Sequence, residues 1–269
     1  MDLGLNGRVA IVTGASRGIG AATTTALRRE GCEVLAVARG AEALHAIPGA
    51  FGPEEDHRGP LGRVVPFAAD VTAPDGPTSI IAACIEAFGR VDVLVNNAGG
   101  AEPRRLDGLD DEAWRAAFEL NFFAAVRMSA AALPEMRTRR WGRLVHVASV
   151  SGREPDPLFA PYSAAKAAML NYSTSLSQAY AADGVLSSCV VPGVTLTELV
   201  ADNASAASAR LGSSPDEVMA TMLQRHRVAA GRFGEVDEVA AAIVFLASER
   251  ASWITGATLE VDGGTLRSV

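Results

Sequence analysis

Short apolar runs alternate with longer amphipathic stretches along almost the whole chain. An apolar run that ends in glycine or polar residues is typical of a buried strand, whereas apolar positions three or four residues apart are typical of a helix. The pattern predicts strands over residues 8–13, 33–38, 64–69, 91–95, 144–148, 187–191 and 258–261. It predicts helices from the first glycine-rich turn to about residue 30, and over 41–46, 76–88, 110–139, 162–182 and 235–248.

This alternation predicts one α/β domain over residues 1–269, with a single doubly wound Rossmann-type parallel sheet of about seven strands and helices on both faces. Ligands of such sheets bind at the carboxyl ends of the strands. Pro66 lies inside a predicted strand and indicates that this strand is at an edge, because proline cannot donate a ladder hydrogen bond. Residues 41–63 give a short helix and then an irregular excursion, and residues 198–230 predict one or two mobile helices that form a substrate lid.

A glycine-rich turn, Gly14-Ala15-Ser16-Arg17-Gly18-Ile19-Gly20, separates the first strand from the first helix. Glycines let the backbone approach a pyrophosphate, and the free N–H groups at the start of a helix bind its charge. The spacing is G-x-x-x-G-x-G rather than the commoner G-x-G-x-x-G, and an ordinary strand-to-helix turn is the alternative interpretation. The strand in front of the turn favours a dinucleotide site.

The second strand ends in Arg39 rather than in a carboxylate. A protein specific for NAD usually has an Asp or Glu there, hydrogen-bonded to the ribose 2′-OH. A guanidinium instead can pair with a 2′-phosphate, and Arg17 in the glycine turn offers a second cation. The sequence therefore favours NADP(H) over NAD(H); the alternative is that Arg39 is a solvated charge that stacks on the adenine.

Tyr162 and Lys166 lie four residues apart in a stretch rich in helix formers, so they are expected on one helix face. A nearby cation favours the phenolate, and such a tyrosine is a proton donor and acceptor near neutral pH. Tyr-x-x-x-Lys is common by chance, so the hypothesis depends on the other parts of the chain.

The composition excludes several classes. A net charge of −7 argues against non-specific nucleic-acid binding, and no uninterrupted apolar run has the length of a membrane span. The first residues are not expected to form a signal peptide, because no basic stretch is followed by an apolar core. The three cysteines, Cys32, Cys84 and Cys189, lie far apart among apolar residues and predict buried thiols in a reducing, cytoplasmic compartment. No metal site is expected: His45 and His57 are predicted to have solvated surface roles, because no other potential metal ligands cluster with them in the sequence.

Three further positions have two interpretations each. Asn96-Asn97-Ala98-Gly99 ends the fourth strand, where its amides could bind a ligand, although an ordinary turn explains the pattern equally well. Asn121 lies among apolar residues of a helix and is either a satisfied core amide or the holder of a water. His146, inside a predicted strand, is expected to be a packed histidine rather than a base.

Together these residues resemble the short-chain dehydrogenase/reductase family, in particular its branch similar to 3-oxoacyl-(acyl-carrier-protein) reductases. The resemblance extends from Gly7 to Gly264. It rests on the following motifs: Thr13 to Gly20, Asn96-Asn97-Ala98-Gly99, Ser149, Tyr162-x-x-x-Lys166 and Pro192-Gly193. In that family the active serine lies 13 residues before the tyrosine, which selects Ser149 rather than Ser151.

The resemblance implies hydride transfer between a nicotinamide and a ketone or secondary alcohol. Tyr162 would act as general acid and base, Lys166 would lower its pKa and hold the nicotinamide ribose, Ser149 would bind the substrate oxygen, and Asn121 would hold a water. The implied cofactor-binding residues are Gly14, Ser16, Arg17, Gly18, Ile19, Gly20, Arg39, Asp70, Val71, Asn97, Ala98, Gly99, Tyr162, Lys166, Pro192, Gly193, Val194, Thr195 and Thr197.

The substrate is less clear from the sequence. Carrier-protein-dependent members of the family have basic residues near the site mouth; Arg140 matches one of them, but Asp183 reverses the charge of the other. We therefore expect a free ketone or alcohol, bulky and apolar because of the long lid, with a 3-oxoacyl thioester as the alternative substrate. A non-catalytic nucleotide sensor is a further alternative, disfavoured because Tyr162 and Lys166 are both present. The resemblance also implies a homotetramer, or a dimer. From the net charge and the apolar runs, we expect neither nucleic acid nor membranes as partners.

Overall fold

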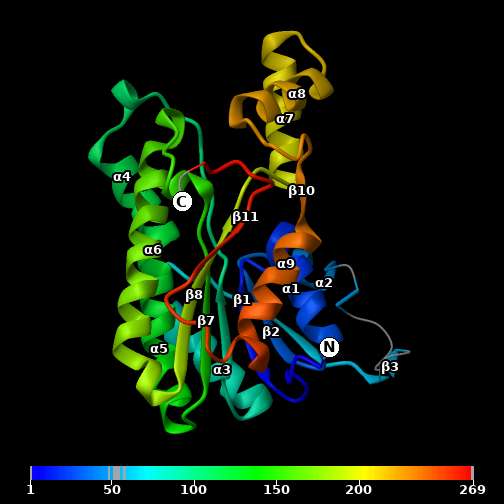
Figure 1. The fold of residues 1–269 in the computed structure, drawn as a ribbon, viewed down its shortest axis with the longest axis vertical. Helices are drawn as coiled ribbons and strands as arrows, with labels where there is room; N and C mark the ends of the chain where they lie inside the picture. Colours follow the sequence, from blue (N-terminus) through cyan, green and yellow to red (C-terminus); the bar gives the residue numbers. More distant parts are fainter. Residues whose placement is uncertain (1, 48, 51–54, 57–58, 268–269) are drawn as a thin grey trace.

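A computed structural model describes residues 2–47, 49–50, 55–56 and 59–267 of the chain. Its centre is a seven-stranded sheet in which every neighbouring pair is parallel, in the order β11-β8-β7-β6-β1-β2-β5 (Figure 1). The strands are β1 (Val9–Thr13), β2 (Glu33–Ala38), β5 (Val64–Ala68), β6 (Val93–Asn96), β7 (Gly142–Val147), β8 (Val185–Pro192) and β11 (Thr258–Val261). The predicted fold class is confirmed, and the order reverses beside β1, where such sheets bind their ligands.

Helices cover both faces of this sheet (Figure 1). The helices are α1 (Gly18–Arg29), α2 (Ala41–His45), α3 (Gly76–Phe88), α4 (Asp111–Phe118), α5 (Ala124–Thr138), α6 (Ala160–Tyr180), α7 (Glu198–Leu211), α8 (Pro215–His226) and α9 (Val236–Ala247). Short 3-10 turns lie at Leu106–Gly108, Val150–Gly152, Pro157–Phe159, Ala181–Asp183 and Glu249–Ala251. In Figure 1, α7 and α8 stand apart at one end of the molecule.

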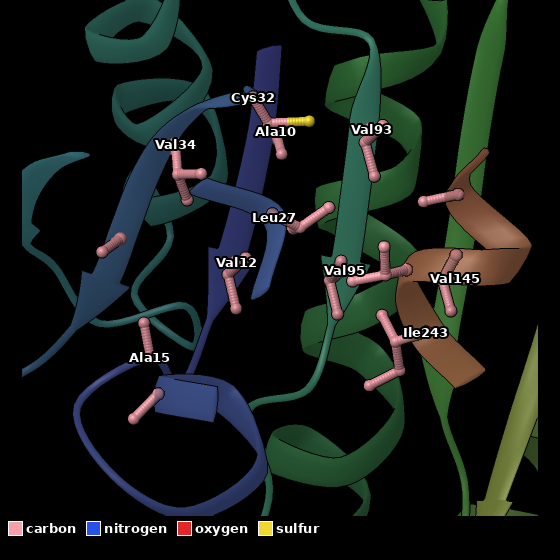
Figure 2. Packing of buried hydrophobic residues seen from close by; sticks show 14 of the residues in the cluster. Ala10, Val12, Ala15, Leu27, Cys32, Val34, Val93, Val95, Val145 and Ile243 are labelled. Atoms are coloured by element: carbon pink, nitrogen blue, oxygen red, sulfur yellow. The ribbon is translucent and has the colours of Figure 1, made fainter. Parts of the chain in front are cut away.

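The alternation of side chains along each strand divides the core into two layers. Ala10 and Val12 of β1 pack with Leu27 of α1 and Ile243 of α9, as Figure 2 shows. Val9 and Ile11, which alternate with them along β1, point to the opposite face and pack with residues of α3 and α5. The inner strands are therefore buried on both faces, which explains why their sequences are largely apolar rather than alternating. Full burial of one such aliphatic side chain contributes about 1.5–3 kcal/mol.

Two details of the sheet test the predictions from the pattern. β5 lies at an edge of the sheet, and its Pro66 pairs with Ala36 of β2 on one side, as predicted. Residues 55–60, expected to be irregular, include an antiparallel pair between β3 (Glu55–Asp56) and β4 (Gly59–Pro60). Residues 48, 51–54 and 57–58 lie outside the described part of the chain, so the structure does not test the surface role predicted for His57.

The segment between β8 and α9 contains a second small sheet that the pattern did not predict. β9 (Thr195–Leu196) pairs in parallel with β10 (Gly234–Glu235). This pair joins the two ends of the segment that carries α7 and α8, because β9 precedes α7 and β10 follows α8. The predicted lid is thus a helical pair with a closed base.

One long helical stretch, Asp111–Thr138, is apolar enough to cross a membrane by length and mean hydropathy. Charged residues such as Arg127 interrupt it, so the stretch does not contradict the prediction that no uninterrupted apolar run has the length of a membrane span. Met128, Ala132 and Met136 of this stretch are buried in the layer between the sheet and α3. This packing is that of the core helix of a folded domain, and core helices pass the same test of length and composition.

At the amino ends of the strands, away from the glycine turn, a charged network joins the residue before β1 to the 3-10 turn after α9. Glu249 accepts hydrogen bonds from Arg8 Nη2 (2.7 Å) and from the indole N–H of Trp141 (2.8 Å). The guanidinium carbons of Arg8 and Arg143 lie 3.8 and 4.3 Å from the Trp141 ring centroid. Arg143 is 4% exposed, and burial lowers its pKa to about 10.

Candidate active site

The glycine turn packs closely against the end of β6. Gly14 has φ +65°, and a Cβ there would lie 2.9 Å from the Cα of Ala98. A Cβ on Gly20 would lie 2.2 Å from the carbonyl oxygen of Gly14. Neither glycine can be replaced without a shift of backbone, since these contacts are shorter than any ordinary carbon contact.

Two polar side chains fix this turn to the neighbouring strand end. The hydroxyl of Thr13 accepts hydrogen bonds from the N–H groups of Asn97 (3.0 Å) and Ala98 (3.1 Å) and donates to the carbonyl of Val95 (3.1 Å). The side-chain amide of Asn97 donates to the carbonyls of Thr13 (2.9 Å) and Gly14 (3.2 Å). Asn97 therefore holds the turn in place, a role that the strand-end pattern did not indicate.

The start of α1 has the features of an anion site. Arg17 precedes the helix in an extended conformation, and its side chain makes no capping hydrogen bond. The first turn of α1 contains no acidic residue. The first N–H groups of a helix have no partner within it and carry a partial positive charge. Ser16 and Ile19 are half-buried beside them.

Arg39 and Asp70 lie near each other at the ends of β2 and β5. Hydrogen bonds from the hydroxyl and N–H of Thr72 lower the pKa of the Asp70 carboxyl, and the positive charge of Arg39 lowers it further. Arg39 is exposed, and Val71 beside Asp70 is buried. A cation and a carboxylate thus lie near each other at the ends of β2 and β5, and their role in cofactor binding stays a prediction.

Ser149 and Tyr162 face each other at the carboxyl end of β7. Burial raises the pKa of the Tyr162 phenol, and a hydrogen bond to the Ser149 side chain lowers it in part. The Ser149 hydroxyl also accepts a hydrogen bond from the N–H of Ser151 (3.2 Å), so Ser151 supports the serine by its backbone.

Lys166 lies one turn after Tyr162 on α6 and is 3% exposed. Its ammonium donates to the carbonyl of Val147 (2.7 Å) and lies 5.6 Å from the Tyr162 ring centroid. Burial lowers its pKa to about 8. In this structure the hydrogen bond from the Ser149 side chain lowers the pKa of Tyr162, while the Lys166 ammonium donates to a strand carbonyl. The expectation that Lys166 also lowers this pKa stays a prediction.

The chain's basic residues are almost all arginine: it contains 23 arginines, and Lys166 is its only lysine. A guanidinium stays protonated, whereas an ammonium shifts its pKa readily when buried. The position therefore holds the one ammonium group of the chain, and burial brings its pKa to about 8. This signal was present in the sequence and would have identified Lys166 without any motif.

Asn121 lies in a π turn, Glu119–Phe123, between α4 and α5. Its side chain accepts a hydrogen bond from the N–H of Gly100 (3.0 Å) and donates to the carbonyls of Gly100 and Ala117 (3.0 Å each). A Cβ on Gly99 would lie 2.8 Å from its Oδ1 and 3.5 Å from Lys166 Nζ. Asn121 thus ties the loop after β6 to a widened helical turn beside Lys166, and π turns are frequent at functional sites.

His146 and Asn96 are buried below this site rather than in it. His146 is fully buried, and burial lowers its pKa to about 3, so it is neutral, which confirms a packed histidine rather than a base. Its Nδ1 lies 3.2 Å from the Asn96 amide, which also donates to Ser129 (3.1 Å). The three cysteines are buried and free, as predicted.

The loop after β8 returns to the glycine turn. Pro192 pairs with Val261, and a Cβ on Gly193 would lie 2.8 Å from the Cα of Asp262. Thr195 is buried and donates to the Gly193 carbonyl (3.3 Å), while Val194 is half-buried. Thr197 caps α7 and lies against Gly18, whose Cβ would be 3.2 Å from its methyl group.

The structure thus brings the residues predicted from sequence together at the carboxyl ends of the strands. Their roles in binding stay predictions. Among the described residues, no group of three or more His, Cys, Asp or Glu is placed to hold a metal. Thr13 and Thr72 were missed, because a single threonine at a strand end carries no distinctive pattern.

Comparison with known proteins identifies the family. Residues 8–208 match the family described as short chain dehydrogenase. The chain belongs to this family. The 3-oxoacyl-[acyl-carrier-protein] reductase FabG of Vibrio cholerae is 36% identical to it over 97% of this chain and 98% of that protein. The FabG of Escherichia coli is 34% identical over the same shares.

A solved structure gives the same result. L-sorbose reductase from Gluconobacter frateurii, complexed with NADPH and L-sorbose, superposes on the full length of both chains with a TM-score of 0.92 and 32% identity. This short-chain dehydrogenase is therefore an oxidoreductase that acts on C=O or CH–OH groups, as its family and these relatives are.

Proposed function

We propose that the protein is an NADP(H)-dependent oxidoreductase that interconverts a ketone and a secondary alcohol, with Tyr162 as general acid and base. The observation that carries this proposal is the meeting of Tyr162 with the Ser149 hydroxyl and the Lys166 ammonium beside the glycine turn. A phenol placed between a hydrogen-bonding hydroxyl and a titratable ammonium has the parts that proton transfer requires.

The bound nicotinamide supplies or accepts the hydride, and the chain's own residues handle the proton. In the reducing direction, the Tyr162 phenol donates its proton to the substrate oxygen while the Ser149 hydroxyl hydrogen-bonds that oxygen. The ammonium of Lys166, whose pKa is about 8, is charged at neutral pH and stabilises the phenolate that forms. Asn121 holds the loop of Gly100 in position.

The residues near the glycine turn fit NADP(H) better than NAD(H). Arg39 at the end of β2 offers a charge to a 2′-phosphate, and Arg17 offers a second one. The L-sorbose reductase that this chain resembles was solved with NADPH, which supports the same preference. We expect a much lower KM for NADPH than for NADH, and equal values for the two cofactors would contradict the proposal.

The charges around residue 183 support a free substrate over a carrier-bound one. Asp183 pairs with Arg137 at 2.6 Å, and Arg140 donates to the carbonyl of Ala182 (3.1 Å). These arginines are engaged within the chain, so they offer little to an acidic carrier protein. A 3-oxoacyl thioester reductase remains the second candidate, because the FabG relatives match nearly the whole chain.

A substrate panel tests this proposal. NADPH oxidation is measured with free ketones and ketoses, with a 3-oxoacyl-CoA and with a carrier-bound 3-oxoacyl chain. The free compounds should give the higher kcat/KM, and the reverse order would favour the thioester reductase. No turnover with any of them, in either direction, would leave the nucleotide sensor as the better account.

We also propose that the protein acts in the cytoplasm as a homotetramer in which α5 and α6 pair between subunits. Four large apolar side chains are exposed among the described residues, and two of them support an assembly: Phe123, just before α5, is 45% exposed, and Trp253 is 96% exposed. The three buried free thiols fit a reducing compartment. Sedimentation of a monomer at micromolar concentration would contradict the assembly.

A further inference from the structure

We infer that Glu198 and Asp202 of α7 compete with the phosphates of the cofactor for the glycine turn, and that these two carboxylates thereby limit cofactor affinity. This inference rests on the proposed NADP(H) site and concerns residues to which that proposal gives no role.

The first observation is an ion pair between α7 and the glycine turn. Asp202 Oδ2 lies 3.9 Å from Nη1 of Arg17, and the two side chains are 73% and 56% exposed. Arg17 is the second cation proposed for the 2′-phosphate. The Asp202 carboxylate thus pairs with the same guanidinium that the 2′-phosphate of the cofactor would need.

The second observation is that Glu198 approaches the start of α1. Its Oε2 would lie 3.6 Å from a Cβ on Gly18, the first residue of that helix. The start of a helix favours negative charge, and the first turn of α1 supplies none of its own. Glu198 therefore places an anion where the pyrophosphate would bind.

Glu198 and Asp202 face the glycine turn from the same side of α7. Residues 198 and 202 are four apart, so they lie on the same face of α7. That face meets the turn at Thr197, which packs against Gly18. A cofactor with its phosphates on this turn must displace both carboxylates or accept two unfavourable like-charge contacts.

The other end of the helical pair is held more firmly. Nη2 of Arg225 on α8 lies 2.7 and 2.6 Å from the two carboxylate oxygens of Asp156, and Asp156 is 11% exposed. Asp156 also caps the 3-10 turn that leads into α6 and Tyr162. The Arg225–Asp156 pair is shorter and less exposed than the Arg17–Asp202 pair, so it is the stronger of the two. We therefore expect α7 to separate from the glycine turn before α8 separates from Asp156 when the cofactor binds.

The experiment measures dissociation constants of NADPH and NADH by titration calorimetry, with Asp202→Asn, Glu198→Gln and a matched control, Asp216→Asn. Asp216 carries the same charge on the same helical pair and lies at the exposed start of α8. We expect Asp202→Asn to tighten NADPH binding about twofold to fivefold, the range of an exposed ion pair, and to affect NADH less. Glu198→Gln should tighten both cofactors, since both carry the pyrophosphate.

The control should leave both constants unchanged, and the gains should shrink at high ionic strength. In an Arg17→Gln background, Asp202→Asn should have no further effect on NADPH, because its partner is gone. Unchanged or weaker NADPH binding in both α7 variants, with unchanged unfolding temperatures, would overturn the inference. Failure of the wild-type protein to bind either cofactor would instead refute the proposed function.

Discussion

Replacing Lys166 by methionine is the sharpest test of how this site is built. Methionine has nearly the length of lysine but no charge, so the variant removes the buried ammonium with little change in volume. Burial lowers the pKa of Lys166 from 10.5 to about 8. Each pKa unit corresponds to 1.36 kcal/mol, so the charged lysine costs the folded protein about 3 kcal/mol at pH 7.

The lost hydrogen bond acts in the opposite direction. Lys166 donates to the Val147 carbonyl at 2.7 Å, and leaving that buried acceptor without a donor costs about 1–3 kcal/mol. The net change in stability at pH 7 is therefore small, from near zero to about 2 kcal/mol in favour of the variant. Turnover should be lost in either case, since the titratable group is gone.

The pH dependence isolates the charge. Between about pH 8 and 10.5, the unfolded wild-type chain holds a proton that the folded protein has released. Raising the pH in this range therefore stabilises the wild-type protein relative to Lys166→Met. By pH 9.5 the wild-type protein should gain about 2 kcal/mol on the variant compared with pH 7, because other titrations are common to both proteins.

Two measurements check this prediction. Urea unfolding of both proteins at pH 7 and 9.5 gives the difference in stability. Because Lys166 is the only lysine, protein labelled with ¹³C at the lysine Cε gives a single resonance whose titration reports this one pKa. A resonance that titrates near 10.5, or a stability difference that is the same at both pH values, would refute the reasoning.

Three other changes have definite expected results. Tyr162→Phe should lower kcat by about 10²–10⁴-fold while NADPH still binds, and a near-normal rate would exclude the tyrosine as the acid. Gly20→Ala places a methyl group 2.2 Å from the Gly14 carbonyl oxygen, so it should lower stability by about 1–3 kcal/mol and weaken NADPH binding in calorimetry. Glu249→Gln removes the charge between two arginines and should cost about 1 kcal/mol in urea unfolding. Asp111→Asn, an exposed residue 3.9 Å from its partner, is its control and should change stability by less than about 0.5 kcal/mol.

The surroundings of Lys166 show where prediction from sequence stops. The four-residue spacing placed Tyr162 and Lys166 on one helix, and the structure confirms this. The same spacing suggested that the lysine acts on the tyrosine directly. The spacing could not show the contacts at the end of β7, where the Val147 carbonyl accepts a hydrogen bond from the ammonium and Ser149, two residues later, supplies the hydrogen bond to the phenol.

Asn121 and the α7–α8 segment lead to the same conclusion. The sequence pattern predicted one continuous helix over 110–139, but a π turn widens it at Asn121. There the side-chain amide accepts a hydrogen bond from the N–H of Gly100 and donates one to the carbonyl of the same residue, which comes from the loop after β6. The segment after residue 197 showed helices but not the β9–β10 pair at its base, since two-residue strands carry no periodicity.

By itself the sequence determined the strands of the central sheet, the longer helices, their buried faces, the glycine turn and the family, because each of these follows from the spacing of residues near one another in the chain. The tertiary structure alone decided the partners of the charged groups and thus the directions of their pKa shifts. These depend on strand order, which brings residues more than a hundred positions apart, such as Arg8 and Glu249, or Arg17 and Asp202, within 4 Å of each other. Burial and contact set the free energy of a charge, and neither is a local property of the chain.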